Sequence, residues 1–167
     1  MKRITLYFAF LSLLLSLVSA CDMHSSDNGS LDGYWQLTQA DTLSVDTLTG
    51  AILAERSGDV RAKGFFWAIQ ADLLEIIDVH DKRIDTTYLH QGVFFRFKQE
   101  SGRLSIYAPS IDQRYDVPEY PDGEVKNLYL LNYYGIYSME ETFSILQLTD
   151  ERMVLQGNHF RFHFRKY

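Results

Sequence analysis

Hydrophobic and polar residues alternate along much of the chain. The pattern is clearest at the C-terminus, where three aromatic residues alternate with four basic ones: Phe160, Phe162 and Phe164 against His159, Arg161, His163 and Arg165. Successive side chains of a β-strand point to opposite faces of the sheet. The pattern therefore predicts a strand with one aromatic face and one basic face.

Further runs with strand character follow one another along the chain. They cover residues 33–43, 64–70, 73–79, 89–100, 103–108, 142–148 and 152–156. In the first of them, Trp35, Leu37 and Gln39 are predicted to share one face. Residues 50–56 fit either a short strand or one or two helical turns, and residues 128–137 resume the apolar pattern. Residues 109–127 contain all three prolines, which predicts a long loop.

These segments give eight or nine strands and no convincing long amphipathic helix. Consecutive antiparallel strands with short connections form a meander, and closing a long meander into a barrel removes its exposed edges. We therefore predict an all-β fold, an up-and-down barrel of eight or nine strands. A sandwich of two sheets is the alternative.

The two faces of the strands have different expected environments. In a small closed barrel the inward face is filled by large apolar side chains or encloses one small ligand. The three phenylalanines at positions 160, 162 and 164 are expected to point inward, as are Val93, Phe95 and Phe97. The basic row would then face water, because burying unpaired guanidinium groups is costly. The alternative is that the basic row lines a polar cavity for an anionic ligand.

The N-terminus has the features of an export signal. Lys2 and Arg3 precede an uncharged apolar run, and the sequence Val18-Ser19-Ala20-Cys21 resembles the lipobox of bacterial lipoproteins. The resemblance implies cleavage after Ala20 and lipid on Cys21. Cys21 is the only cysteine, so it forms no intramolecular disulfide, and lipid attachment accounts for it. The alternatives are an uncleaved membrane helix and an ordinary signal peptide that leaves the thiol free.

This interpretation divides the chain into a signal peptide (residues 1–20), a flexible tether (21–30) and a barrel domain (31–167). Without the signal peptide, 14 Lys and Arg stand against 22 Asp and Glu. An acidic chain lacks the basic surface that nucleic acid or a polybasic membrane contact requires. We expect a location in the cell envelope, anchored by lipid to the outer membrane and facing the periplasm. Asp22 resembles the inner-membrane retention signal of enterobacteria, which leaves the choice of membrane open.

The first predicted strand begins with Gly33-Tyr34-Trp35, which resembles the first lipocalin motif, G-x-W. In lipocalins the Trp closes one end of an eight-stranded barrel and an Arg near the last strand packs across it; Arg161 and Arg165 are the available matches. Thr149-Asp150 partly matches the lipocalin T-D-Y turn, with Glu151 in place of Tyr. The mature chain is similar to small lipocalin-like lipoproteins of unknown function from gut Bacteroidetes. That resemblance implies a barrel in the envelope and no catalytic residue.

Two functional interpretations remain open. In the leading one, a non-enzymatic binding module holds a small apolar or amphipathic ligand inside the barrel. Its candidate lining residues are Trp35, Phe66, Trp67, Phe160, Phe162 and Phe164, with Tyr115 and Tyr120 on a lid loop. In the alternative, the barrel is solid and its loops or outer surface contact an envelope or secreted protein.

An enzyme is a third, less favoured interpretation, because none of the common catalytic or phosphate-binding motifs occurs. No cofactor is implied. A metal site that combines His80 and His90 with Asp78, Asp81 or Asp85 is conceivable, but a solvated turn is the simpler interpretation.

Overall fold

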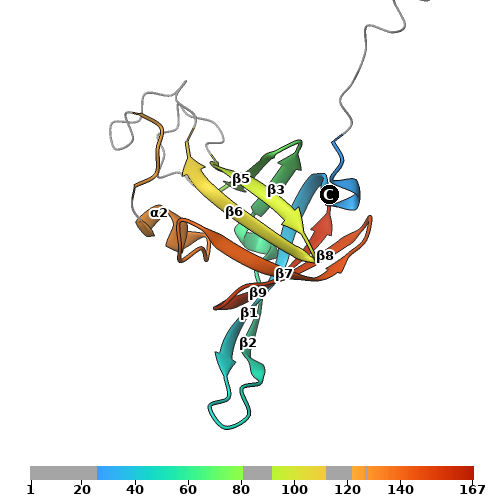
Figure 1. Ribbon diagram of the computed structural model, residues 1–167, viewed down its shortest axis with the longest axis vertical. Coiled ribbons are helices and arrows are strands. Elements are labelled where there is room, and N and C mark those ends of the chain that lie inside the picture. Colours follow the sequence, from blue (N-terminus) through green and yellow to red (C-terminus); the bar gives the residue numbers. More distant parts are fainter. Residues whose placement is uncertain (1–25, 81–91, 112–121, 127) are drawn as a thin grey trace, which may run out of the picture.

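A computed structural model describes residues 26–80, 92–111, 122–126 and 128–167 (Figure 1). The predicted cleavage and lipidation sites, Ala20 and Cys21, lie outside the described residues. The predicted lid residues Tyr115 and Tyr120 lie outside them as well, as do His90, Asp81 and Asp85.

The described chain forms nine antiparallel strands. They are β1 (Gly33–Val45), β2 (Ile52–Asp59), β3 (Phe65–Gln70), β4 (Leu73–Asp78), β5 (Val93–Glu100), β6 (Arg103–Ser110), β7 (Glu141–Leu148), β8 (Arg152–Gln156) and β9 (Phe160–Lys166). Their order in the sheet is β2-β1-β3-β4-β5-β6-β7-β8-β9, and β1 also pairs with β9. This last pairing closes eight strands into a barrel and leaves β2 as an extra strand. The predicted barrel is confirmed, and the two-sheet sandwich is wrong.

Strand β1 has two partners on one of its edges. Its first residues, Gly33 to Gln36, pair with β3, and its later residues pair with β2 from Gln39 onward. On its other edge, the pairing with β9 shifts register between Leu37 and Gln39, so Thr38 is the extra residue of a β-bulge. The hairpin of β1 and β2 therefore extends away from the barrel wall (Figure 1).

The bulge also corrects one sequence prediction. Trp35 and Leu37 point inward, but Gln39 does not, because the extra residue reverses the alternation. Ala40 takes the inward position and packs against the core. Asp41, opposite Arg161 in the ladder, consequently belongs to the outer face.

The two ends of the barrel are covered differently. At one end lies the 3-10 helix η1 (Gly29–Leu31), together with the C-terminus; at the other lies the helix α2 (Leu128–Tyr133) (Figure 1). Another 3-10 helix, η2 (Arg61–Lys63), joins β2 to β3. Residues 52–59 adopt the strand alternative, while residues 128–133 form a helical turn and a half in place of a strand. They contain no β-branched residue, and leucine favours helix.

Candidate functional site

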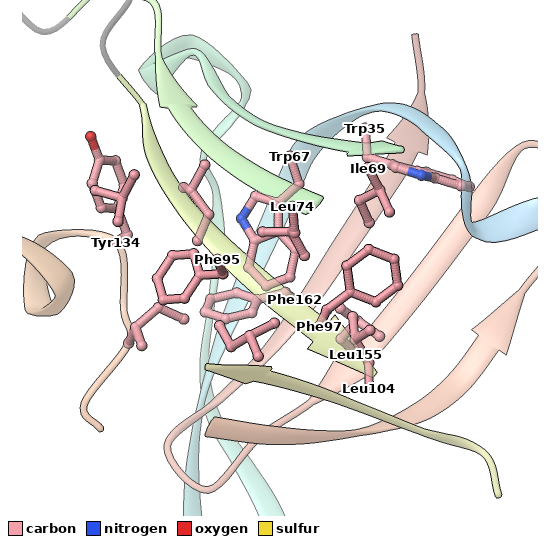
Figure 2. Close-up of a cluster of buried hydrophobic side chains, with 14 of the residues drawn as sticks. Trp35, Trp67, Ile69, Leu74, Phe95, Phe97, Leu104, Tyr134, Leu155 and Phe162 are labelled. Atoms are coloured by element: carbon pink, nitrogen blue, oxygen red, sulfur yellow. The ribbon is translucent and has the colours of Figure 1, made fainter. Parts of the chain in front are cut away.

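Aromatic side chains meet at the centre of the barrel (Figure 2). The ring of Trp67 on β3 lies 5.0 Å from that of Phe164, 5.8 Å from that of Phe143 and 6.1 Å from that of Phe162, measured between ring centroids. These separations are typical of aromatic rings in contact. The cluster joins β3, β7 and β9, strands from opposite sides of the closed sheet.

The interior around this cluster is filled. A cavity large enough for a ligand would leave exposed area on the side chains that line it, yet the exposed fractions of the central residues are 0 to 3%. These residues are Trp35, Trp67, Leu74, Phe95, Leu104, Ile106, Phe143, Met153, Leu155, Phe162 and Phe164. Among the described residues, the middle of the barrel is thus a packed core.

The six predicted lining residues have three different positions. Trp35, Trp67, Phe162 and Phe164 belong to the packed core. Phe160 is only partly buried and stacks on Phe162, with 5.7 Å between ring centroids. Phe66 lies on the outer face, where it stacks on Tyr34 at 4.7 Å and meets the edge of Tyr167 at 5.5 Å. The inward face of the last strand is confirmed.

At the η1 end, Trp35 is fixed by two contacts. Its indole Nε1 donates a hydrogen bond of 2.7 Å to the carbonyl oxygen of Leu31, and the Nζ of Lys166 lies 4.9 Å from the centroid of its ring. The expected match to the lipocalin arginine is therefore wrong. Lys166 packs across Trp35. On the outer face, Arg161 donates a hydrogen bond to the side-chain oxygen of Gln156, and Arg165 donates one to that of Gln36.

Lys166 could have been found from the alternation alone. Positions 160, 162, 164 and 166 lie on the same face of a strand, so the inward face continues past the last phenylalanine to this lysine. The sequence analysis considered only arginines, because the family resemblance pointed to them.

The turn that partly matches T-D-Y joins the same end of the barrel. The hydroxyl of Ser30 donates to Oδ1 of Asp150 (2.7 Å), and the backbone amide of Lys166 donates to the carbonyl oxygen of Glu151 (2.8 Å). Asn28 also donates to the carbonyl oxygen of Ala71. The last residues of the predicted tether thus belong to the cover of the barrel.

At the α2 end, the chain between β6 and β7 packs into the barrel. Leu131 of the helix and Ile136 after it have no exposed surface. The hydroxyl of Tyr133 donates to Oδ2 of the buried Asp78 (2.5 Å), which links α2 to β4. The carboxylate of Glu141, also buried, accepts from the backbone amide of Tyr137 (3.1 Å). Both ends of the described interior are therefore covered.

The basic row of the last strand faces outward, as predicted. His163 forms a 2.8 Å contact between its Nε2 and Oδ2 of Asp41, which is 4% exposed. Burial raises the pKa of Asp41, but hydrogen bonds from Gln39, His163 and Ser57 outweigh it, so the pKa lies below its ordinary value. Two side chains of the outer face of β9, His163 and Arg165, are thus hydrogen-bonded to β1.

A groove crosses this outer face. We call it the outer groove; its volume is about 630 Å³, and it is lined by Thr38, Gln39, Asp59, Arg61, Gln147, Glu151, Arg152, His163, Phe164, Arg165 and Lys166. One wall comes from Asp59, at the end of β2, and from Arg61 in η2, beside the Thr38 bulge. The other wall comes from β7, β8 and the turn between them. Its lining is mainly polar.

Another hollow, of about 930 Å³, lies on the outside over β1, β3, β4 and β5, beside Tyr34, Leu73 and Phe94.

Within the part of the chain that the structure describes, no group of three or more His, Cys, Asp or Glu side chains is placed to hold a metal ion. The helices found there are all too short or too polar to span a membrane.

The chain is similar to known proteins in its sequence family and in its fold. A family model described as a lipocalin-like domain matches residues 13–167. A solved lipocalin-like protein from Bacteroides uniformis shares 20% identity, with a TM-score of 0.50 over 83% of this chain and all of that one. An uncharacterized protein from Bacteroides eggerthii gives 20% identity and a TM-score of 0.49 over 81% of this chain and 98% of that one. No curated protein sequence matches.

Proposed function

The chain belongs to the family of lipocalin-like domains, and on this premise we propose that it is a non-enzymatic binding module anchored to the cell envelope through lipid on Cys21. The Val18-to-Cys21 sequence and the single cysteine support the anchor. Two acyl groups or more hold a protein stably on a bilayer, where one chain holds it only marginally.

The module binds through its outer surface, with the barrel as a solid scaffold. The observation that carries this part of the proposal is the packed interior, where Trp67 contacts Phe162 and Phe164 and the central side chains are at most 3% exposed. A ligand site of ordinary size needs a concavity of roughly 300–1,000 Å³. The outer groove is in this range at about 630 Å³.

A small apolar or amphipathic ligand inside the barrel is the second candidate function. It is favoured by the aromatic character of the core, to which four of the six predicted lining residues belong. It requires that α2, a helix of only six residues, move away together with Leu131 and Ile136. Removing these two fully buried side chains from the core would cost several kcal/mol, on the order of 2 kcal/mol for each.

Native mass spectrometry of the chain from residue 22 onward separates the two functions. With Arg152 of the outer groove replaced by Gln, we expect the bare polypeptide mass, unchanged by organic extraction and by incubation with envelope lipids. A discrete added mass that extraction removes and that this variant retains would contradict the solid barrel and give the size of an interior ligand. Trp fluorescence provides a second measurement, because an apolar ligand beside Trp67 would quench or shift its emission.

The anchor has its own test. In a bacterial host that grows with an alkyne-labelled fatty acid, the wild-type protein should incorporate label and sediment with membranes. Cys21→Ser should do neither, while the matched variant Ser26→Ala should behave as the wild type. A Cys21→Ser variant that stays in the membrane fraction would show that the apolar N-terminal segment itself is the anchor.

A further inference from the structure

We propose that the outer groove is a binding site for a small polar ligand carrying an oxyanion, such as a phosphate, sulfate or carboxylate group, held between Arg152 and Arg165. The inference rests on the proposal that the module binds through its exterior, and it adds the site and the chemical class of the ligand.

The two arginines are direct neighbours across the sheet. Arg152 on β8 pairs with Arg165 on β9 in the ladder, and both are exposed on the outer face of the barrel. Side chains in such a pair have Cβ atoms about 4.5–5.5 Å apart, and like charges at this distance repel each other. An oxyanion bound between them removes the repulsion.

Their guanidinium groups are available for such a ligand. Among the described residues, neither Arg152 nor Arg165 forms an ion pair; Arg165 donates one hydrogen bond, of 2.9 Å, to the neutral amide oxygen of Gln36. A guanidinium group presents a planar fork of N–H donors that matches a carboxylate or phosphate in bidentate geometry. Two forks on one side of a groove can therefore hold one oxyanion from two directions.

The other ionisable side chains of the outer groove, apart from Glu151, already have partners. Arg61 forms an ion pair with Asp59. His163 contacts Asp41. Lys166 donates to the carbonyl oxygen of Ser30 and lies over Trp35. Glu151 is the acidic group of the lining that remains beside the two arginines.

The balance of charge in the groove is opposite to that of the chain. Apart from the inward-pointing Lys166, its lining contains three arginines (Arg61, Arg152 and Arg165) and two acidic residues (Asp59 and Glu151), whereas the whole chain has a net charge of −6. A concave surface with an excess of one charge attracts ligands of the opposite charge. The groove is thus a local positive site on an acidic protein.

The rest of the lining indicates how polar the remainder of the ligand is. Gln147, Thr38 and Gln39 add neutral polar side chains, although the Thr38 hydroxyl donates to the carbonyl oxygen of His163 and the Gln39 amide donates to Asp41. The one aromatic residue, Phe164, is 3% exposed. Such walls suit a hydroxylated body, as in a sugar phosphate or a sugar acid, better than an acyl chain. The same oxyanion chemistry is found in free metabolites and in lipid headgroups.

The site is tested on the chain from residue 21 with Cys21→Ser, by two-dimensional NMR titration with inorganic phosphate, glucose 6-phosphate and glucuronate at constant ionic strength. We expect saturable shifts at Arg152, Arg165 and Gln36 with at least one of these probes. Arg152→Gln and Arg165→Gln should each weaken binding at least tenfold, and Glu151→Gln should tighten it. Arg103→Gln, the same change on the outer face of β6, is the control and should have no effect.

Two further measurements complete the test. Without ligand, Arg152→Gln should leave the midpoint of urea unfolding unchanged or raise it, because repulsion is relieved; a lowered midpoint would give the arginine a structural role and overturn the proposal. Co-sedimentation with vesicles of phosphatidylcholine, with or without one quarter phosphatidylglycerol, distinguishes a headgroup from a free anion. No saturable shift with any probe or vesicle, or equal effects of Arg152→Gln and Arg103→Gln, would also overturn it. Since native mass spectrometry tests the interior and these titrations test the groove, the two proposals can fail separately.

Discussion

The ammonium group of Lys166 lies 4.9 Å from the centroid of the Trp35 ring. The lysine reaches this position by passing close to Gly33, where a Cβ atom would lie 2.5 Å from its Cε. The first and third residues of the G-x-W motif therefore act together, because the glycine leaves the space through which the lysine covers the tryptophan. This contact closes one end of the barrel.

Gly33→Ala should destabilise the protein markedly. The backbone at Gly33 has a φ of +134°, a conformation that alanine rarely adopts, and the added methyl group would displace Lys166. We expect a loss of about 2–4 kcal/mol in the free energy of unfolding. Urea unfolding followed by Trp fluorescence measures it. Gly58→Ala is the matched control, since its Cβ would lie 3.8 Å from the nearest atom; a similar loss in both variants would contradict the explanation.

The core substitution Phe162→Ala should be among the most destabilising. Phe162 is 3% exposed and its ring contacts those of Trp67, Phe143, Phe160 and Phe164. Removing a buried aromatic ring costs about 3–5 kcal/mol. Leu146→Ala on β7, where the side chain is 52% exposed, should change the free energy of unfolding by less than about 0.5 kcal/mol. A small effect of Phe162→Ala would indicate an interior with spare room, as a ligand cavity would have.

The cover at the α2 end should open when its anchor is shortened. Leu131 has no exposed surface, whereas Tyr129, two residues earlier on the same helix, is 82% exposed. Leu131→Ala should cost about 2–5 kcal/mol and raise amide hydrogen exchange in residues 128–136. Tyr129→Ala should change both far less, because little of this residue is buried. Equal exchange in the two variants would mean that the helix does not depend on this buried side chain.

The free energy of unfolding should fall at acidic pH, because the carboxylate of Asp41 becomes protonated. Its pKa is lowered in the folded protein, so its contribution is present above the ordinary carboxyl pKa and is lost as pH falls through the folded value. Asp41→Asn should therefore lose about 1–3 kcal/mol at pH 7 relative to the wild type, and the difference should shrink toward pH 3. Urea unfolding between pH 3 and 7 measures it, with the exposed Asp27→Asn as control. A difference independent of pH would assign the effect to shape and not to charge.

The sequence by itself determined the class of fold and the two faces of most strands. Strict alternation of large apolar with polar residues leaves a strand one way to bury its apolar side, so β9 and β5 could be oriented without a structure. The prediction of a barrel followed from the number of such strands and their short connections. The inward position of Lys166 was also present in the alternation.

The tertiary structure alone decided where the alternation breaks and which surfaces meet. The bulge at Thr38 depends on how β1 divides its pairing between β3, β2 and β9, and no local pattern records such a division. It sends Gln39 outward, places Asp41 beside His163 and gives the outer groove its wall. Arg152 and Arg165 likewise lie opposite each other only because of the register between β8 and β9. That register is a relation between two strands, and the sequence of neither strand specifies it.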